Sequence, residues 1–259
     1  MLKTNYHCHT TRCFHAQGED EAYVQAAVKG GFDVLGIADH GPWPFDDGHV
    51  SGMRLTMEDL PQYLASINGL KEKYAGQIEL HVGFEQEYWP RYRQHPEWLL
   101  ENGAEYLILG QHILDAENHS VWTSIITQED DGVLRYADSV CEAVSTGWYS
   151  YVAHPDLFMA RRTVDQFNTV CERATEMICQ ACREQNIPLE YNLLGAGEKR
   201  AYPSAPFWEL ARKYWDHAIL GVDAHNPAAL LNDALFMESR EKLTKMGYTV
   251  LEALPFKEV

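Results

Sequence analysis

The sequence lacks any apolar run long enough to cross a bilayer, and residues 1–5 contain no apolar core of a secretion signal. It also has little positive charge, because 21 lysines and arginines stand against 38 acidic residues, for a formal net charge of −17. Such an excess opposes attraction to nucleic acid polymers and to anionic membranes. We therefore expect a cytoplasmic protein whose partner is a small molecule, and the sequence leaves its oligomeric state open.

Cysteine is sparse and scattered, with six residues in 259. Only Cys179 and Cys182 have the CxxC spacing, and they lie in a stretch of helical periodicity without a second such pair. This context favours neither a structural zinc site nor a redox pair, so we expect reduced thiols. Linkers, low-complexity tracts and internal repeats are absent too, which predicts one domain over residues 1–259.

Short apolar runs alternate with longer amphipathic ones along the whole chain, which is typical of repeated βα units. The runs predict seven strands, at 3–9, 32–38, 78–84, 105–109, 149–153, from 187–189 onward, and at 218–222. Helices are predicted between them at 19–29, 57–74, 96–102, 131–145, 164–185 and 203–215. One or two more helices and a short apolar segment at 248–254 are expected in the tail. This order indicates an α/β protein, most simply a closed or nearly closed parallel barrel, with an open doubly wound sheet as the alternative.

The strongest functional signal is the position of the histidines. His7 and His9 are two residues apart in the first strand, so their side chains share a face. Potential metal ligands recur at almost every later strand exit, namely His40, Glu85, His112, His154, Asp223 and His225, and His15 follows closely after the first strand. The carboxyl ends of parallel strands meet at one rim, so these residues are expected to converge there.

Seven histidines and two carboxylates are too many donors for one ion. At three or four protein ligands per catalytic ion, they predict two or three divalent ions. Glu85 and Asp223 are the carboxylates that could bridge two ions. Donors of nitrogen and oxygen without cysteine suit zinc, manganese or iron, and the sequence does not choose among them.

Other polar residues are given lesser roles. His81 is expected to pack within the third strand, and His49, His95, His119 and His217 are expected to be solvated. Asp39 lies on the strand face opposite to His40, which favours a structural role. Glu87 shares a face with Glu85, and the pattern leaves open a substrate contact, an acceptor behind the ligands or a rim charge.

As a set, these motifs resemble those of the PHP (polymerase and histidinol phosphatase) superfamily. The resemblance is carried in order by His7-Cys8-His9-Thr10, Asp39-His40, Gly83-Phe84-Glu85, Gly110-Gln111-His112, Ala153-His154-Pro155 and Asp223-Ala224-His225. It implies a distorted (β/α)7 TIM-like barrel with a trinuclear metal site. It also implies nine metal ligands: His7, His9, His15, His40, Glu85, His112, His154, Asp223 and His225.

Within that superfamily, the chain is most similar to the stand-alone histidinol-phosphate phosphatases of histidine biosynthesis. The narrower resemblance rests on 83–88, 154–158, 190–192 and 202–204. The run Asn-Thr-Ser-Gly-Leu-Arg, frequent in those enzymes after the sixth strand, is replaced here by a longer run that ends at Arg200. The resemblance implies a phosphoric monoester hydrolase acting on L-histidinol phosphate.

For this reaction Asp223, His225 and Glu85 are the expected catalytic residues. Candidate substrate contacts are Arg161, Arg162 and Arg200 for the phosphate, and Glu87 for the substrate's ammonium group, with Asp156 and Glu190 completing an acidic rim. A PHP-type phosphodiesterase acting on a small nucleotide or another phosphoester remains the alternative. A metal-binding module without catalysis is disfavoured, because a lapsed site should have gaps in its ligand set.

Overall fold

The computed structural model describes residues 2–119, 121–254 and 256 of the chain. Over these residues eight strands form one sheet in consecutive order, and every neighbouring pair is parallel. The strands are β1 (Thr4–Asn5), β2 (Val34–His40), β3 (Glu79–Gln86), β4 (Tyr106–Leu109), β5 (Tyr151–Val152), β6 (Leu189–Asn192), β7 (His217–Gly221) and β8 (Thr249–Val250). Consecutive order excludes a doubly wound sheet, which requires a reversal of strand order, and confirms the curled α/β architecture.

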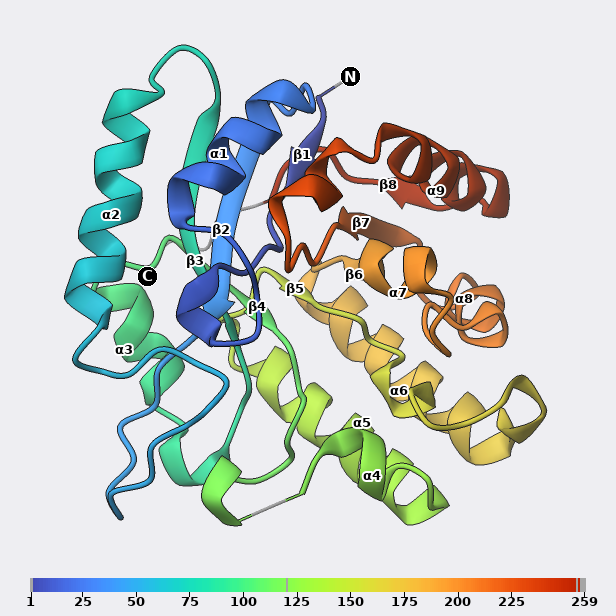
Figure 1. The fold of residues 1–259 in the computed structure, drawn as a ribbon. Helices are drawn as coiled ribbons and strands as arrows, with labels where there is room; N and C mark the ends of the chain where they lie inside the picture. Colours follow the sequence, from blue (N-terminus) through green and yellow to red (C-terminus); the bar gives the residue numbers. More distant parts are fainter. Residues whose placement is uncertain (1, 120, 255, 257–259) are drawn as a thin grey trace.

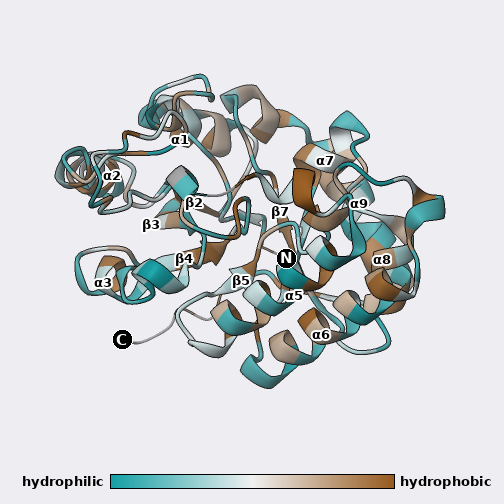
Figure 2. Ribbon diagram, turned by 90° about the horizontal axis from the view of Figure 1, so that it is seen from below, coloured by the Kyte–Doolittle hydropathy of each residue, from teal (hydrophilic) through white to brown (hydrophobic). Residues whose placement is uncertain are grey.

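Helices surround the curled sheet on its outside, as Figures 1 and 2 show from two directions. They are α1 (Asp20–Lys29), α2 (Leu60–Lys73), α3 (His95–Glu101), α4 (Thr123–Ile126), α5 (Asp130–Ser145), α6 (Thr169–Gln185), α7 (Leu193–Glu198), α8 (Ala205–Ala211) and α9 (Asp233–Met246). Short 3₁₀ turns lie in the connections, including η1 (Thr11–Cys13), η3 (Glu117–His119) and η4 (Leu157–Met159). None of the helices in the described part of the chain has the length and apolarity to cross a membrane.

The sheet meets itself at the carboxyl ends of β1 and β7. There the His9 N–H donates to the Ala224 carbonyl over 2.9 Å, and Cys8 forms a parallel bridge with Ala224. The Val222 N–H also donates to Asn5 Oδ1 over 2.8 Å. β8 pairs with β7 only at its other end. The eighth strand, in the apolar segment at 248–254, therefore adds to the seven predicted ones without separating β1 from β7 at the rim.

Side chains alternate between two environments along each strand. One face of the sheet belongs to the large core shared with the helices, as for Leu35 and Ile37 of β2. The other face carries a smaller core, which includes Ala38, Tyr106 and Tyr151. By this alternation His40, Glu85 and Glu190 lie on the inner face at the ends of their strands, above the small core. The barrel therefore changes from apolar to polar toward its carboxyl rim.

Local capping explains where two predicted elements differ from the structure. The predicted helix at 164–185 is split, because the Asn168 side chain accepts from the Val170 and Cys171 N–H groups and starts α6 only at Thr169. The first strand ends at Asn5 rather than at residue 9, and the Asn5 amide bonds the His7 carbonyl.

All six cysteines are free thiols.

Candidate metal centre

The structure brings the nine predicted ligands to the carboxyl rim of the barrel. Glu85 lies at the centre of this group and is 1% exposed. Ring nitrogens of five histidines lie between 2.9 and 3.5 Å from its carboxylate oxygens: His7, His9, His40, His112 and His154. Register explains part of this arrangement, because β2 and β3 pair His40 directly with Glu85.

Asp223 forms a second carboxylate focus on the β7 side of the rim. Its Oδ1 lies 3.2 Å from His9 Nε2, 3.4 Å from His7 Nε2 and 3.4 Å from His225 Nδ1. The Asn192 amide donates to its Oδ2 over 3.0 Å. Asp223 has a φ of 51°, an uncommon left-handed conformation for a residue other than glycine, so the surrounding structure must hold it there.

Two glycines make room for buried carboxylates beside the strands. A Cβ atom on Gly110, after β4, would lie 1.9 Å from Glu85 Oε1. A Cβ atom on Gly221, at the end of β7, would lie 1.7 Å from Glu190 Oε1. Any larger residue at either position would displace the neighbouring carboxylate, so both positions require glycine.

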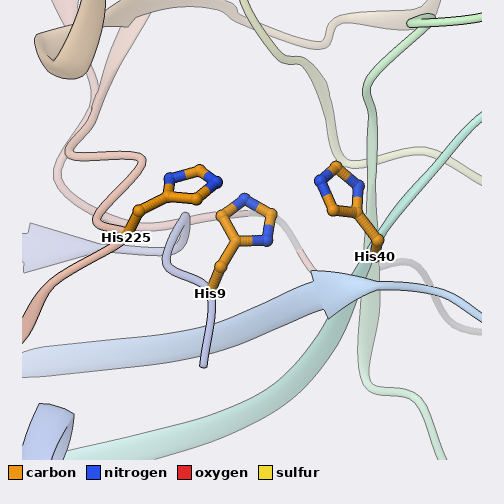
Figure 3. A group of neighbouring side chains, drawn as sticks. All are labelled: His9, His40 and His225. Atoms are coloured by element: carbon orange, nitrogen blue, oxygen red, sulfur yellow. The ribbon is translucent and has the colours of Figure 1, made fainter. Parts of the chain in front are cut away.

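Eight of the nine predicted ligands fall into four groups of three whose donor atoms lie within 4.8 Å of one another. These groups are His9–His40–His225, His7–His9–Glu85, His7–His154–Asp223 and His40–Glu85–His112. Figure 3 shows the first group, in which the rings lie side by side with His9 between the other two. The ninth residue, His15, is exposed at the rim, and its ring centre lies 5.0 Å from that of His225.

A further compact group joins His9 with Cys13 and Asp39. The Asp39 carboxylate is already bound there, because it accepts both the N–H and the hydroxyl of Thr10 over 2.7 Å. This supports the structural role expected for Asp39.

The carboxylates and imidazoles of the centre shift one another's pKa values. Burial alone would raise the pKa of Glu85, but His112, His7 and His40 lower it well below its ordinary value. The pKa of His40 is in turn well below its ordinary value, because burial disfavours its charged form. Ionised carboxylates beside neutral ring nitrogens are the donors that a divalent cation requires.

His7 and His9 respond differently to burial although both are fully enclosed. Burial and the charge of His225 lower the pKa of His9 to about 3. Burial also acts to lower the pKa of His7, but Glu190, Asp223 and Glu85 together raise it well above the ordinary value. Positive charge is therefore favoured at the ring of His7, where three carboxylates meet.

Glu190 is a site residue whose position was not foreseen. It was expected at an acidic rim, but it is 0% exposed. Its Oε1 lies 2.6 Å from His7 Nδ1, and its Oε2 accepts the His154 N–H over 2.9 Å and the Asn192 amide over 3.0 Å. It therefore orients two predicted ligands from behind. The available signal was its inward-facing position at the end of β6, two residues before Asn192.

The other two acids of the expected rim are also buried away from the cavity. Glu87 is 0% exposed and binds both terminal nitrogens of the Arg54 guanidinium over 2.9 Å. Burial would raise the pKa of Glu87, but Arg54 and His112 lower it to about 2. Asp156 accepts the Ser204 N–H, and its burial raises its pKa to about 7. The expectation that Glu87, Asp156 and Glu190 form a solvent-facing rim was wrong, because all three turn inward.

A cavity of about 630 Å³ opens onto the centre. Arg161 and Arg200, two of the three candidate phosphate contacts, both line it. Arg162 does not, because its guanidinium is buried and donates to the Thr127 and Gln128 carbonyls and to Asp130. The remaining wall is formed mainly by apolar side chains and Tyr202, with Met53, Trp122, Leu157, Ala160, Leu194 and Ala201 among them.

The remaining histidines lie away from the centre. His81 sits between Glu79 and Glu105, at 2.8 and 2.9 Å. His95, expected to be solvated, is only 7% exposed, since its ring stacks on Trp98 and its Nε2 bonds the Pro42 carbonyl.

Comparison with known proteins shows the family to which the chain belongs. Residues 5–193 match the model of the PHP domain. The chain is 27% identical over 228 residues to a probable histidinol-phosphatase of Deinococcus radiodurans, covering 85% of each protein. It is 25% identical over 158 residues to the histidinol-phosphatase of Bacillus subtilis, covering 58% of each.

Two solved structures share the fold of the chain. The hisK protein of Listeria monocytogenes superposes with a TM-score of 0.75 at 20% identity, covering 89% of this chain and 98% of that one. The histidinol phosphate phosphatase of Lactococcus lactis, determined with zinc, L-histidinol and phosphate, superposes with a TM-score of 0.73 at 18% identity. That superposition covers 96% of this chain and 95% of the Lactococcus chain.

Proposed function

This chain belongs to the PHP domain family, and from that premise we propose that it is a metal-dependent phosphatase that hydrolyses L-histidinol phosphate to L-histidinol and phosphate. Residues 1–259 would act as one metal-dependent phosphoesterase domain. The observation that carries the proposal is the cluster of imidazoles around Glu85 and Asp223, which opens onto the cavity. The relatives named histidinol-phosphatase, and the Lactococcus protein with its bound zinc, histidinol and phosphate, support this substrate.

The residues present fit divalent metal ions. Seven imidazoles and two carboxylates offer mixed nitrogen and oxygen donors. In the described part of the chain, the Nδ1 atoms of His9, His40, His112 and His154 are buried without a hydrogen-bond partner. The nine predicted ligands would hold two or three ions, of zinc, manganese or iron. When bound, such ions supply a water of lowered pKa and neutralise charge on the phosphoryl and leaving oxygens.

The protein's own groups would then hold the substrate. Glu85 and Asp223 are central acceptors among the imidazoles, with His225 beside Asp223, so these three residues would set the geometry around the reacting phosphate. Arg161 and Arg200 line the cavity and would bind phosphoryl oxygens with their guanidinium groups. The in-line hydrolysis of a phosphate ester depends mainly on such positioning and charge stabilisation.

The leaving group would occupy the wall of the cavity beyond the phosphate. Trp122 and Leu157 offer apolar surface there for an imidazole ring and its carbon chain. Among the described residues that line the cavity, the carboxylates are Glu85, Asp223 and Glu198. Glu198 lies outside the metal centre and pairs with Arg200 at 2.7 Å. We propose that the substrate replaces this ion pair, with its phosphate on Arg200 and its ammonium group on Glu198.

A substrate panel tests the proposal. The purified protein is stripped with a chelator, reloaded with manganese or zinc, and assayed for phosphate release from L-histidinol phosphate and for cleavage of a nucleotide phosphodiester. We expect metal-dependent release of phosphate from histidinol phosphate, and elemental analysis of the untreated protein to report the native metal. Faster cleavage of the diester, or no hydrolysis with any of these metals, would refute the assignment.

A further inference from the structure

Arg54 is a fully buried arginine at the centre of a charged network beside the metal centre. It lies in the loop between β2 and α2 and is 0% exposed. Its Nη1 and Nη2 donate to the two oxygens of Glu87 over 2.9 Å each, and its Nε donates to Glu117 Oε2 over 2.8 Å. Its Nη1 also approaches the Gly41 carbonyl at 3.3 Å, and its guanidinium carbon lies 5.5 Å from the Trp89 ring centre.

One arm of this network leads to a predicted metal ligand. Glu87 Oε1, which accepts from Arg54 Nη2, lies 3.6 Å from His112 Nδ1. The opposite nitrogen of the same ring, Nε2, lies 3.5 Å from Glu85 Oε1 at the centre. The ring of His112 thus stands between two carboxylates, and Glu87 faces the nitrogen that points away from the centre.

A similar arrangement occurs at three other histidines of the centre. Nδ1 of His7 lies 2.6 Å from Glu190 Oε1, Nδ1 of His15 lies 2.6 Å from the Cys13 carbonyl, and Nδ1 of His225 lies 3.0 Å from the Asp223 carbonyl. An acceptor at Nδ1 keeps the proton on that nitrogen and leaves the Nε2 lone pair for a metal. At His112 the oxygen that faces Nδ1 belongs to the Glu87 carboxylate, 3.6 Å away, and that carboxylate is itself held by an arginine.

We propose that Arg54 is a positioning residue of the metal centre, which acts by holding Glu87 as the acceptor for the Nδ1–H of His112. Two parallel hydrogen bonds fix the plane of the Glu87 carboxylate, which a single-point cation such as lysine cannot do. Arg54 also offsets the charge of Glu87, which burial would otherwise make costly. The inference rests on the metal centre of the proposed function but not on the identity of the phosphate ester.

The second arm of the network provides the matched control. Glu117, in η3, binds Arg54 Nε and accepts the Ser51 hydroxyl over 2.8 Å, and it lies 3.3 Å from His49 Nε2. Glu117 thereby ties the loop that carries Met53 to the loop that carries Trp122. It pairs with the same guanidinium as Glu87 but belongs to neither the centre nor the cavity lining. Neutralising Glu117 therefore disturbs the network without removing the acceptor of His112.

The test compares Glu87→Gln, Glu117→Gln and Arg54→Lys in the full-length protein. Each metal-free variant is titrated with zinc against a chromophoric chelator, and with cobalt(II), whose visible spectrum reports ligand geometry. We expect Glu87→Gln to weaken the affected metal site about 10- to 100-fold and to alter the cobalt spectrum. Arg54→Lys should act in the same direction, and Glu117→Gln should stay within about twofold of the wild type.

The outcomes separate the possible failures. Equal affinities of the wild type and Glu87→Gln, or equal losses for Glu87→Gln and Glu117→Gln, would overturn the positioning role and leave Arg54 a structural clamp. A wild-type protein that binds no metal would instead refute the proposed function. If Arg54→Lys does not fold, the two glutamine variants still decide, because glutamine keeps the shape of glutamate.

Discussion

Replacing Asp223 by asparagine tests the metal centre with little change of shape, because it removes one negative charge and keeps the side chain. Asparagine suits the position for two reasons. Its amide oxygen can still accept the Asn192 hydrogen bond, which is 3.0 Å long in the wild type. It also tolerates the φ of 51° better than alanine, which would add backbone strain to the chemical effect.

The size of the effect follows from the contacts of the carboxylate. Asp223 Oδ1 lies within 3.4 Å of ring nitrogens of His7, His9 and His225, and the residue is 5% exposed. Losing a preorganised charge in such an enclosed site costs about 10²- to 10³-fold in turnover, or about 2.7–4 kcal/mol of transition-state stabilisation. We expect kcat to fall by that factor, together with the metal content.

The assay is phosphate release from L-histidinol phosphate by metal-loaded protein, with metal content from elemental analysis and folding from circular dichroism. The matched control is Asp216→Asn. Asp216 directly precedes the same strand, β7, at its opposite end, where it pairs with His217 at 3.0 Å. The control should retain activity within about twofold. A folded Asp223→Asn protein whose turnover stays within about threefold of the wild type would refute the proposed role of Asp223 in the metal centre.

Three further predictions follow from the same geometry. Gly110→Ala should displace the Glu85 carboxylate and lower metal content, with about 1–3 kcal/mol of lost stability from overpacking, measured by elemental analysis and urea unfolding. Arg200→Lys should raise KM for histidinol phosphate, because Arg200 lines the cavity. Arg162→Lys should leave KM unchanged and lower the urea midpoint of unfolding, because it leaves buried carbonyls unpaired. A raised KM for Arg162→Lys and an unchanged KM for Arg200→Lys would reverse their roles. Burial lowers the pKa of His95 to about 4, so the unfolded chain binds more protons between about pH 4 and 6.5 and stability falls as pH falls through that window. His95→Phe should remove this part of the pH dependence. The free energy of unfolding of the wild type minus that of the variant, measured with urea, should then shift by about 2 kcal/mol between pH 7 and pH 5. The same difference at both pH values would contradict this prediction.

Several features of the centre could be predicted from local pattern alone. The strand exits of a parallel α/β fold share one rim whatever the details of closure, so ligands placed at those exits must converge. His40 and Glu85 illustrate this, because each follows an apolar strand and the two strands pair them in register. Side-chain alternation also separated Asp39 from His40 correctly, since alternation is a property of the strand itself.

Other features depended on contacts between residues far apart in the chain. Arg161 and Arg162 are adjacent, yet the first lines the cavity and the second is buried against the start of α5. Arg162 is held in its buried position by Asp130, which lies 32 residues away in the chain, so the spacing of neighbouring residues could not predict it.

By itself, the sequence determined the α/β architecture and the residues that meet at its rim, because both follow from strand periodicity and from the order of ligands along the chain. Only the tertiary structure decided what each acid does. Glu87 and Glu190 are charged residues that the sequence places at the rim, but in the curled sheet Glu87 lies against Arg54 and Glu190 against the ring of His7. A buried carboxylate must find a cation or a hydrogen-bond donor, and which one it finds depends on neighbours that only folding supplies.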